Sequence, residues 1–490
     1  MTCAEVLTNL LGEIFLSFFP HLSLEEEIDK VKFTTKLTLE KLLQKYKHVM
    51  TKQEFRFLHT HLSRPEIPCF YILPKLHKNP IVGRPIVAGH SWITVGCSKL
   101  LTSLLKSIIP RFPNVLKDST SLIKIIESTT FDRNIFLCTL DVVSLYTNIP
   151  VDHAIEVLKQ LIQENIDLFP RKDLADFMIE MLELVLKHNV MEYKQMVFKQ
   201  IFGIAMGTPL APVLANLYLA FLERTLQAKA VESNIRWPIL YKRFIDDCFI
   251  IYQGNKTNLL EFVDLFNSLV DSITLSLQSF GSSVDFLDLT IYKGKRFRRE
   301  GKLDLKIFQK PMNKYLYLPF TTDHPIHCLK SFVTTELQRY VRSCSDRSAY
   351  LTIANLFFKR LLNRDFPVDK LSEWFESVDY NNRMTYLFKQ EIIQEAEGTL
   401  PEENNIRKRA RENMPNSSRY SKAQPLIYKV QYNQRLKRLN LSSILKETVL
   451  EHQAHSADFK TVTANLQPLI CYTRASNLGE KLIRAKVNLT

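Results

Sequence analysis

Apolar and polar residues follow two different spacings along this chain, and these spacings predict which stretches form helices and which form strands. Residues 24–62 carry an apolar side chain every three or four positions, which predicts helices that end before Pro65. Residues 68–96 are strand-like but interrupted by prolines and glycines. Because this second stretch also holds several basic side chains, it suits a hairpin that faces phosphate groups.

Two apolar stretches lead directly to acidic residues. Residues 135–143 are apolar and β-branched around Asp141, which predicts a buried strand ending at this carboxylate. The apolar runs 239–244 and 248–252 flank Asp246 and Asp247, which predicts a β-hairpin with the two acids at its tip.

Helical spacing and turn residues organise the rest of the chain. We expect helices near 154–161, 174–186, 209–226, 258–269 and 324–378, a hairpin within 191–204, and further strands within 284–291 and 303–308.

The composition changes between residues 405 and 440, where ten Lys and Arg residues face a single acid, Glu412. Such a stretch is typical of a linker or a nucleic-acid-binding arm, and its first basic cluster is also compatible with a nuclear-import signal. The basic residues that we predict to bind nucleic acid are Arg407, Lys408, Arg409, Arg411, Arg435, Lys437 and Arg438.

Composition narrows the class of protein. With 490 residues the chain is long enough for several domains, and its formal net charge of +14 favours a polyanionic partner such as nucleic acid or an anionic membrane surface. No apolar run reaches the roughly 18 residues of a membrane-spanning helix. The eight cysteines show no paired spacing, so we expect neither a disulfide framework nor a zinc site. These features predict a protein that is not secreted and has no membrane partner, located in the nucleus or the cytoplasm.

The three acids suggest phosphoryl transfer. Strand extension requires neutralisation of the charge that develops on the attacking and leaving oxygens, and two Mg²⁺ ions about 3.5 to 4 Å apart do this. Mg²⁺ prefers carboxylate and phosphate oxygens, so Asp141 and Asp246 are candidate ligands, with Mn²⁺ as a possible substitute. Taken alone, the pair Asp246 and Asp247 could equally be a polar hairpin turn.

A glycine-rich segment at 203–216, which includes Met206 and Gly207, lies between the acids. Its glycines would let the backbone approach a base pair, and its prolines would start a closely packed helix. Alone it could be any glycine turn that enters a buried helix. The order of a strand ending in Asp, a glycine turn entering a helix and an Asp-Asp hairpin predicts a polymerase palm.

Three further residues are candidates for nucleotide contact. Tyr146 would lie beneath the incoming sugar, where its ring would clash with a ribose 2′-hydroxyl and select deoxynucleotides; an aromatic packing residue at a strand end is the alternative. Lys75 and Arg84 are candidate triphosphate ligands, because a guanidinium fork matches paired phosphate oxygens. For each of these two, an ordinary solvated charge is the alternative.

These residues resemble the reverse transcriptase pattern, and the sequence motifs are similar to those of the Penelope-like retroelement family. The resemblance covers roughly residues 30–486. The main motifs that carry it are residues 70–78, 83–86, 141–150, 203–216, 244–247, 286–289, 336–345 and 477–486.

The resemblance implies an α+β right-hand polymerase, related to telomerase reverse transcriptase, with fingers, a ferredoxin-like palm and a helical thumb. It implies RNA-directed DNA synthesis from an RNA template, a DNA primer and deoxynucleoside triphosphates. Carried over to this chain, Asp141, Asp246 and Asp247 bind metal and catalyse, and Tyr146 is the sugar gate. Lys75, Arg84, Met206 and Gly207 contact the nucleotide; Met206 stands where retroviral enzymes usually have Gln. A GIY-YIG endonuclease, which commonly follows in this family, is not expected here.

We therefore predict a Mg²⁺-dependent reverse transcriptase. The alternative is a catalytically inactive or host-retained remnant that binds nucleic acid. The predicted domains are an N-terminal helical segment (1–65), fingers (66–130), palm (131–320), helical thumb (321–400), basic arm (401–440) and a C-terminal segment (441–490).

Overall fold

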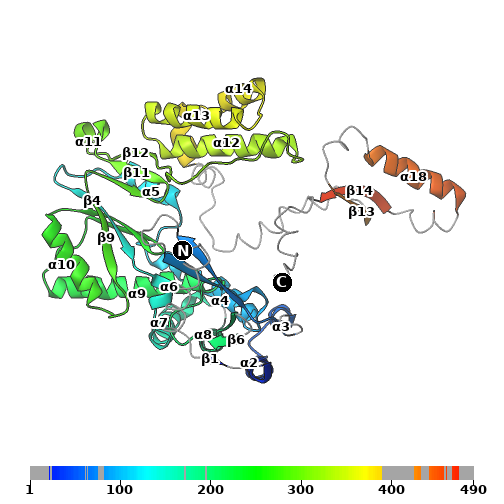
Figure 1. Cartoon of the computed structure of the whole chain (residues 1–490), viewed down its shortest axis with the longest axis horizontal. Helices are drawn as coiled ribbons and strands as arrows, with labels where there is room; N and C mark the ends of the chain where they lie inside the picture. Colours follow the sequence, from blue (N-terminus) through cyan, green and yellow to red (C-terminus); the bar gives the residue numbers. More distant parts are fainter. Residues whose placement is uncertain are drawn as a thin grey trace, which may run out of the picture. The chain divides into compact units, whose positions relative to one another are not determined.

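The computed structural model describes most of the chain. The described residues are 21–22, 25–60, 62, 65–75, 82–169, 171, 173–193, 196–388, 424–431, 441–456, 460 and 466–473. The chain divides into two units, residues 1–313 and residues 314–490, which are described separately (Figure 1).

A four-stranded antiparallel sheet forms the centre of the first unit, with the strand order β7-β8-β4-β9. Its strands are β4 (Phe136–Val142), β7 (Leu240–Phe244), β8 (Asp247–Tyr252) and β9 (Leu275–Gly281). After Asp247, every residue of β8 is buried, because the sheet is covered on both faces. This explains why residues 248–252 form an unbroken apolar run rather than an alternating one.

Helices cover one face of this sheet. They include α7 (Val151–Glu164), α9 (Ala211–Glu232) and α10 (Lys256–Asn267), and α10 contacts both α9 and β9 (Figure 1). With these helices, the four strands follow the β-α-β-β-α-β order of a ferredoxin-like unit. The ferredoxin-like palm predicted from the sequence is therefore confirmed. Strand β9 was not predicted, because residues 275–281 mix serines and a glutamine with apolar residues.

A five-stranded sheet with the order β1-β6-β5-β2-β3 lies in the same unit. Its strands are β1 (His21–Leu22), β2 (Cys69–Lys75), β3 (Val82–Ala88), β5 (Val190–Tyr193) and β6 (Met196–Lys199). β2 and β3 form the predicted hairpin, and β3 is the edge strand. The unit's other helices are α2 (Glu25–Lys45), α3 (Lys52–Thr60), α4 (Val95–Leu105), α5 (Ser119–Ser128), α6 (Leu145–Asn148), α8 (Leu174–Lys187) and α11 (Lys295–Glu300).

The third sheet of this unit is a meander of β10 (Ser283–Phe286), β11 (Leu289–Tyr292) and β12 (Asp304–Ile307). The alternating run at 284–291 folds back on itself, because Leu287 adopts a left-handed φ of 56° and turns the chain. The ring of Phe286 lies 5.7 Å from that of Phe249 on β8, so this meander covers the face of the palm sheet opposite the helices.

The second unit begins with four helices, α12 (Ile326–Ser343), α13 (Arg347–Leu362), α14 (Val368–Glu376) and α15 (Arg383–Leu387). Figure 1 shows α12, α13 and α14 side by side, and α12 contacts both of the others. Their core is aromatic: Phe357 is fully buried, and its ring contacts those of Tyr317, Phe332, Tyr340 and Phe375. The helices expected between 324 and 378 are therefore present.

Later in the chain, β13 (Gln424–Gln431) and β14 (Leu466–Thr473) form a parallel pair, and α18 (Leu441–His455) contacts β14. None of the helices that the structure describes is long and apolar enough to cross a membrane.

Helix α10 offers a direct test of the palm packing. Leu259 is fully buried against the sheet, whereas its neighbour Leu260 is 38% exposed. We predict that Leu259→Ala lowers the free energy of unfolding by about 2 to 5 kcal/mol, because it leaves a cavity. Leu260→Ala should lower it by less than about 1 kcal/mol. Chemical denaturation of both variants measures the difference, and equal losses would show that α10 packs through another face.

Candidate active site in the palm

The pairing of β4 with β8 brings two of the predicted acids together. Asp141 lies directly opposite Asp247 in the antiparallel register. Directly opposed residues project from the same face of a sheet, with Cβ atoms about 4.5 to 5.5 Å apart. Asp246 lies in the turn just before Asp247, and its carbonyl accepts a hydrogen bond of 3.0 Å from the backbone N–H of Val142, next to Asp141. All three acids are therefore at one end of two adjacent central strands.

The turn that carries Asp246 has an unusual backbone. Ile245 has a φ of 57°, in the left-handed region that β-branched residues rarely adopt. Such a residue costs about 1 to 3 kcal/mol and persists only where surrounding contacts determine its conformation. This strain could not be predicted from the sequence, because apolar residues on both sides favour an ordinary hairpin.

The acids repel one another electrostatically. The pKa of Asp247 is raised to about 6, first because packed atoms around its carboxylate desolvate it and then because of the charges of Asp246 and Asp141. The charge of Lys310 acts in the opposite direction. Although the Asp247 side chain is solvent-exposed, its ionised form is disfavoured here.

This donor set has the chemistry that a hard divalent cation requires. Carboxylate oxygens suit Mg²⁺. Desolvation and then the charges of Asp246 and Asp141 raise the pKa of Asp247, and a dication would offset the contribution of those charges. The structure itself shows no metal site: among the residues that it describes, no three His, Cys, Asp or Glu side chains are arranged as a group that could hold an ion. The acids therefore fit a divalent cation in the chemistry of their donor atoms, and a metal site at these residues stays a prediction.

Tyr146 is held next to the glycine-rich segment. It lies in α6, and its carbonyl accepts a hydrogen bond of 2.6 Å from the backbone N–H of Ile204. Gly203 has a φ of 74°, and a Cβ there would lie 2.5 Å from the carbonyl oxygen of Thr147. Only glycine allows this close approach of the two backbones.

The same segment reaches the edge strand β3. The carbonyl of Met206 accepts a hydrogen bond of 2.7 Å from the N–H of Val87. Gly207 has a φ of 117°, and a Cβ there would lie 2.3 Å from the Val87 carbonyl oxygen. Met206 and Gly207 therefore connect the palm residue Tyr146 to the β2–β3 hairpin.

Lys75 and Arg84 lie on one face of that hairpin. Arg84 is opposite Leu73, and Lys75 is opposite Val82, so the alternation of side chains places both cations on the face away from buried Phe70. Arg84 is exposed, as a phosphate ligand must be.

Electrostatics connect this hairpin to the acids through Tyr146. The pKa of the Tyr146 hydroxyl is raised by burial and by the charge of Asp246, and Arg84 acts to lower it. Tyr146 thus lies within electrostatic range of both residues. The structure brings the predicted gate, one predicted acid and one predicted phosphate ligand into one region.

Two charged residues near the acids were not predicted from the sequence, and the predicted basic-arm residues lie outside the described part of the chain. Lys310 was not predicted because nothing in its local sequence marks it as a neighbour of Asp247. Arg243 was also missed, although strand alternation places it on the same face as Tyr241, which is buried, and this could have identified it. The basic-arm residues fall outside the residues that the structure describes; they are Arg407, Lys408, Arg409, Arg411, Arg435, Lys437 and Arg438.

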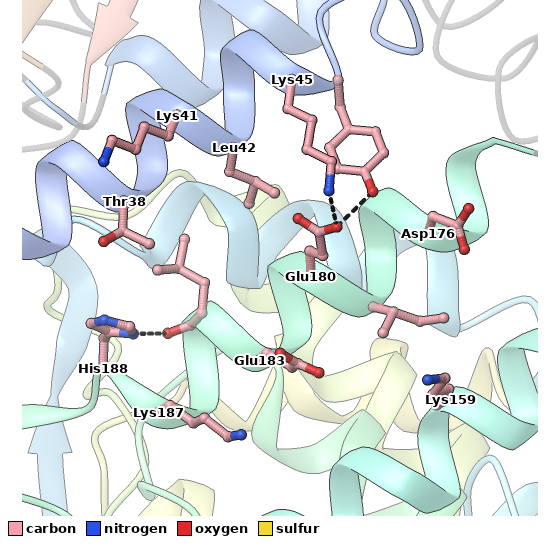
Figure 2. Close-up of a pocket in the computed structure, with 13 residues that line it drawn as sticks. Thr38, Lys41, Leu42, Lys45, Lys159, Asp176, Glu180, Glu183, Lys187 and His188 are labelled. Carbon is pink, nitrogen blue, oxygen red and sulfur yellow. Dashed lines mark hydrogen bonds and ion pairs between the residues drawn. The ribbon is translucent and has the colours of Figure 1, made fainter.

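A large cavity elsewhere in the first unit is separate from these residues. It has a volume of about 840 Å³ and is lined by α2, α7 and α8 (Figure 2). Within it, Glu180 accepts hydrogen bonds from Lys45 at 2.5 Å and from the Tyr46 hydroxyl at 2.8 Å (Figure 2). None of the predicted site residues lines this cavity.

Comparison with known families agrees with the palm geometry. Residues 90–279 match the family described as reverse transcriptase (RNA-dependent DNA polymerase), and this range contains Asp141, Tyr146, Gly207, Asp246 and Asp247. The chain carries a reverse transcriptase domain. The match covers less than half of the 490 residues. A search of curated proteins found no match.

Several solved structures are similar to this chain at low identity. Telomerase from Candida albicans, in complex with a TWJ fragment of telomeric RNA, is 13% identical with a TM-score of 0.46, covering 71% of this chain and 62% of that chain. Apo telomerase from Candida tropicalis is 13% identical with a TM-score of 0.41, covering 80% and 70%. The BmCPV RNA-dependent RNA polymerase at the elongation state is 11% identical with a TM-score of 0.41, covering 72% and 31%. These similarities do not identify the substrate of this chain.

The α+β right-hand polymerase class predicted from the sequence is confirmed, and so is the enzyme class of the domain, an RNA-directed DNA polymerase. The Penelope-like identity, the domain boundaries and the roles of individual residues stay predictions.

The raised pKa of Asp247 predicts how stability depends on pH in metal-free protein. Between its usual pKa of 3.8 and the folded value of about 6, the native state binds more protons than the unfolded state. The contribution of this group to stability is therefore full below the lower value and is lost as pH rises through about 6. Thermal unfolding in EDTA from about pH 4 to 7 measures this effect.

Asp247→Asn should remove this part of the pH dependence, whereas Asp264→Asn, on the exposed face of α10, should retain it. If Asp247→Asn and wild type showed the same slope, the proton would belong to another group.

Proposed function

We propose that this protein is a reverse transcriptase of a Penelope-like retroelement that adds deoxynucleotides to a DNA 3′ end on an RNA template. The observation that carries the proposal is the placement of Asp141 opposite Asp247 on the two central strands of a reverse transcriptase palm. The Penelope-like assignment is supported by the sequence motifs described above. A nuclear or cytoplasmic location is part of the proposal.

The three acids are proposed to hold two divalent cations, Mg²⁺ or Mn²⁺. When bound, such ions activate the 3′-hydroxyl and neutralise charge on the α-phosphate and the leaving pyrophosphate. The residues of the chain provide the geometry. β4 and β8 fix Asp141 and Asp247 relative to each other through backbone hydrogen bonds, and the Val142 N–H fixes the peptide that follows Asp246.

The nucleotide is proposed to lie between the acids and the β2–β3 hairpin. Lys75 and Arg84, on the same face of the hairpin, would bind the triphosphate. The 206–207 peptide would support the base pair, because its backbone lies against β3 without an intervening side chain at Gly207. The basic arm, including Arg407 and Arg438, would bind nucleic acid through its phosphates.

Tyr146 is proposed to exclude ribonucleotides. Its carbonyl accepts a hydrogen bond from the Ile204 N–H, and its side chain is half-buried, which would limit the movement of the ring. A fixed ring beneath the sugar discriminates by steric overlap with a 2′-hydroxyl.

Primer extension tests the activity. We predict that purified wild-type protein extends a DNA primer on an RNA template only with Mg²⁺ or Mn²⁺. Asp246→Asn should reduce incorporation by more than about 100-fold, since loss of a residue that only orients a metal ligand already costs about 10- to 100-fold. Asp264→Asn is the matched control and should behave as wild type. Equal incorporation by wild type and Asp246→Asn, together with salt-sensitive binding of nucleic acid, would favour an inactive nucleic-acid-binding remnant instead.

Sugar selection is tested by Tyr146→Ala. Removing the ring should raise the use of ribonucleotides relative to deoxynucleotides by about 10- to 100-fold, the range of a steric discrimination. Tyr146→Phe keeps the ring and should retain the wild-type preference. Single-nucleotide incorporation with each triphosphate measures the ratio, and an unchanged ratio in the Ala variant would place the gate elsewhere.

A further inference from the structure

Arg243 lies two residues before Ile245, in the strand that leads to the turn with Asp246. Its side chain is almost completely buried. It is 1% exposed and pairs with Glu223 of α9, which is 3% exposed. Its Nε donates to Glu223 Oε1, and its Nη2 donates to Glu223 Oε2 at 3.5 Å. The register places Arg243 opposite Cys248, so its side chain projects toward the helices, on the face opposite Asp247.

The guanidinium also binds the turn itself. Nη1 donates to the carbonyl of Ile245 at 2.9 Å and to the side-chain oxygen of Asn216 at 2.9 Å, and Nη2 donates to the Asn216 carbonyl at 3.1 Å. Ile245 is the residue with the left-handed φ. One side chain thus connects α9 to the strained position of the turn.

Two hydrogen bonds fix the peptide groups on either side of Asp246. The carbonyl before it, from Ile245, accepts from Arg243, and the carbonyl of Asp246 itself accepts from the Val142 N–H. With both peptide planes held, the direction of the Asp246 side chain is restricted to what its own rotamers allow.

Arg243 is itself fixed from several directions. Its backbone N–H donates to the Asn114 carbonyl at 2.8 Å, and its carbonyl accepts from the Leu116 N–H at 2.7 Å. On the other side of the ion pair, the Tyr241 hydroxyl donates to Glu223 Oε1 at 3.1 Å. The guanidinium therefore acts from a rigid position.

Stability alone does not explain this arrangement. A buried ion pair is often no more stabilising than apolar residues of similar volume, because both charges must be desolvated. A lysine could neutralise Glu223, but its single ammonium group lacks the planar fork that reaches Glu223, Asn216 and the turn at once. The fork geometry points to a role in orientation.

We propose that Arg243 is a positioning residue, which sets the direction of the Asp246 carboxylate through the Ile245 carbonyl and anchors it to α9 through Asn216 and Glu223. The inference rests on the proposed polymerase function, and it assigns to Arg243 no contact with substrate.

Arg243→Lys tests the proposal, because it retains the charge opposite Glu223 and removes the fork. The expected result is a fall in kcat of about 10- to 100-fold with the KM for deoxynucleotide changed less than about threefold, as for residues that orient metal ligands. A second readout needs no catalysis: the affinity of the protein for Mn²⁺, measured by electron paramagnetic resonance without nucleic acid, should also fall.

The chain offers a matched control in a second buried pair. Arg296 donates to Glu127 through Nη1 at 3.1 Å and Nη2 at 2.7 Å, with 19% and 5% of the two side chains exposed. Arg296→Lys should lower thermal stability while it leaves kcat and Mn²⁺ affinity at the wild-type level.

Asn216→Ala keeps the ion pair between Arg243 and Glu223 and removes the side-chain oxygen that accepts from Arg243 Nη1. It is the alternative test variant if Arg243→Lys does not fold. It should reduce kcat and Mn²⁺ affinity in the same direction by a smaller factor. The proposal is overturned if folded Arg243→Lys has the wild-type kcat and the wild-type Mn²⁺ affinity. If Arg243→Lys does not fold, the same result in folded Asn216→Ala overturns it. Losses in Arg296→Lys equal to those in Arg243→Lys would also overturn it. Failure of the polymerase assignment is a separate result, seen as wild-type protein that makes no metal-dependent product.

Discussion

The backbone pairing between β4 and β8 is the constraint on which the rest of the site depends. These strands are more than 100 residues apart in sequence, and their register alone decides that Asp141 lies opposite Asp247. A shift of one residue would turn one acid to the helical face of the sheet. The buried apolar residues that follow Asp247 prevent such a shift, because they fit only between the helices on one face and the meander on the other.

The same pairing brings the carboxylates of Asp141 and Asp247 near each other, and this has a local energetic cost. Desolvation and the charges of Asp246 and Asp141 raise the pKa of Asp247, and the backbone strain appears at Ile245. Ile245 lies in the turn and Asp247 is the first residue of β8, and both are next to the hydrophobic core of the first unit. Strain at a site that the surrounding fold determines is typical of functional turns.

Much of this could be predicted from the sequence, and the reasons for success and failure are physical. The strand ending at Asp141 and the hairpin around Asp246 were predictable because apolar runs and acidic breaks are local signals. Strand β9 was not, because its serines and glutamine are tolerated only through its pairing with β4. The roles of Arg243 and Lys310 depend on contacts with residues distant in sequence. Local patterns predict elements, whereas tertiary contacts decide which polar side chains meet.

The most direct test of the central claim is a crystal structure with Mn²⁺, primer, template and an incoming deoxynucleotide, in which anomalous scattering locates the metal. We expect Mn²⁺ to be bound by carboxylate oxygens of Asp141, Asp246 and Asp247, next to the triphosphate. Mn²⁺ that binds elsewhere, or acids that project from opposite faces of the sheet, would contradict it.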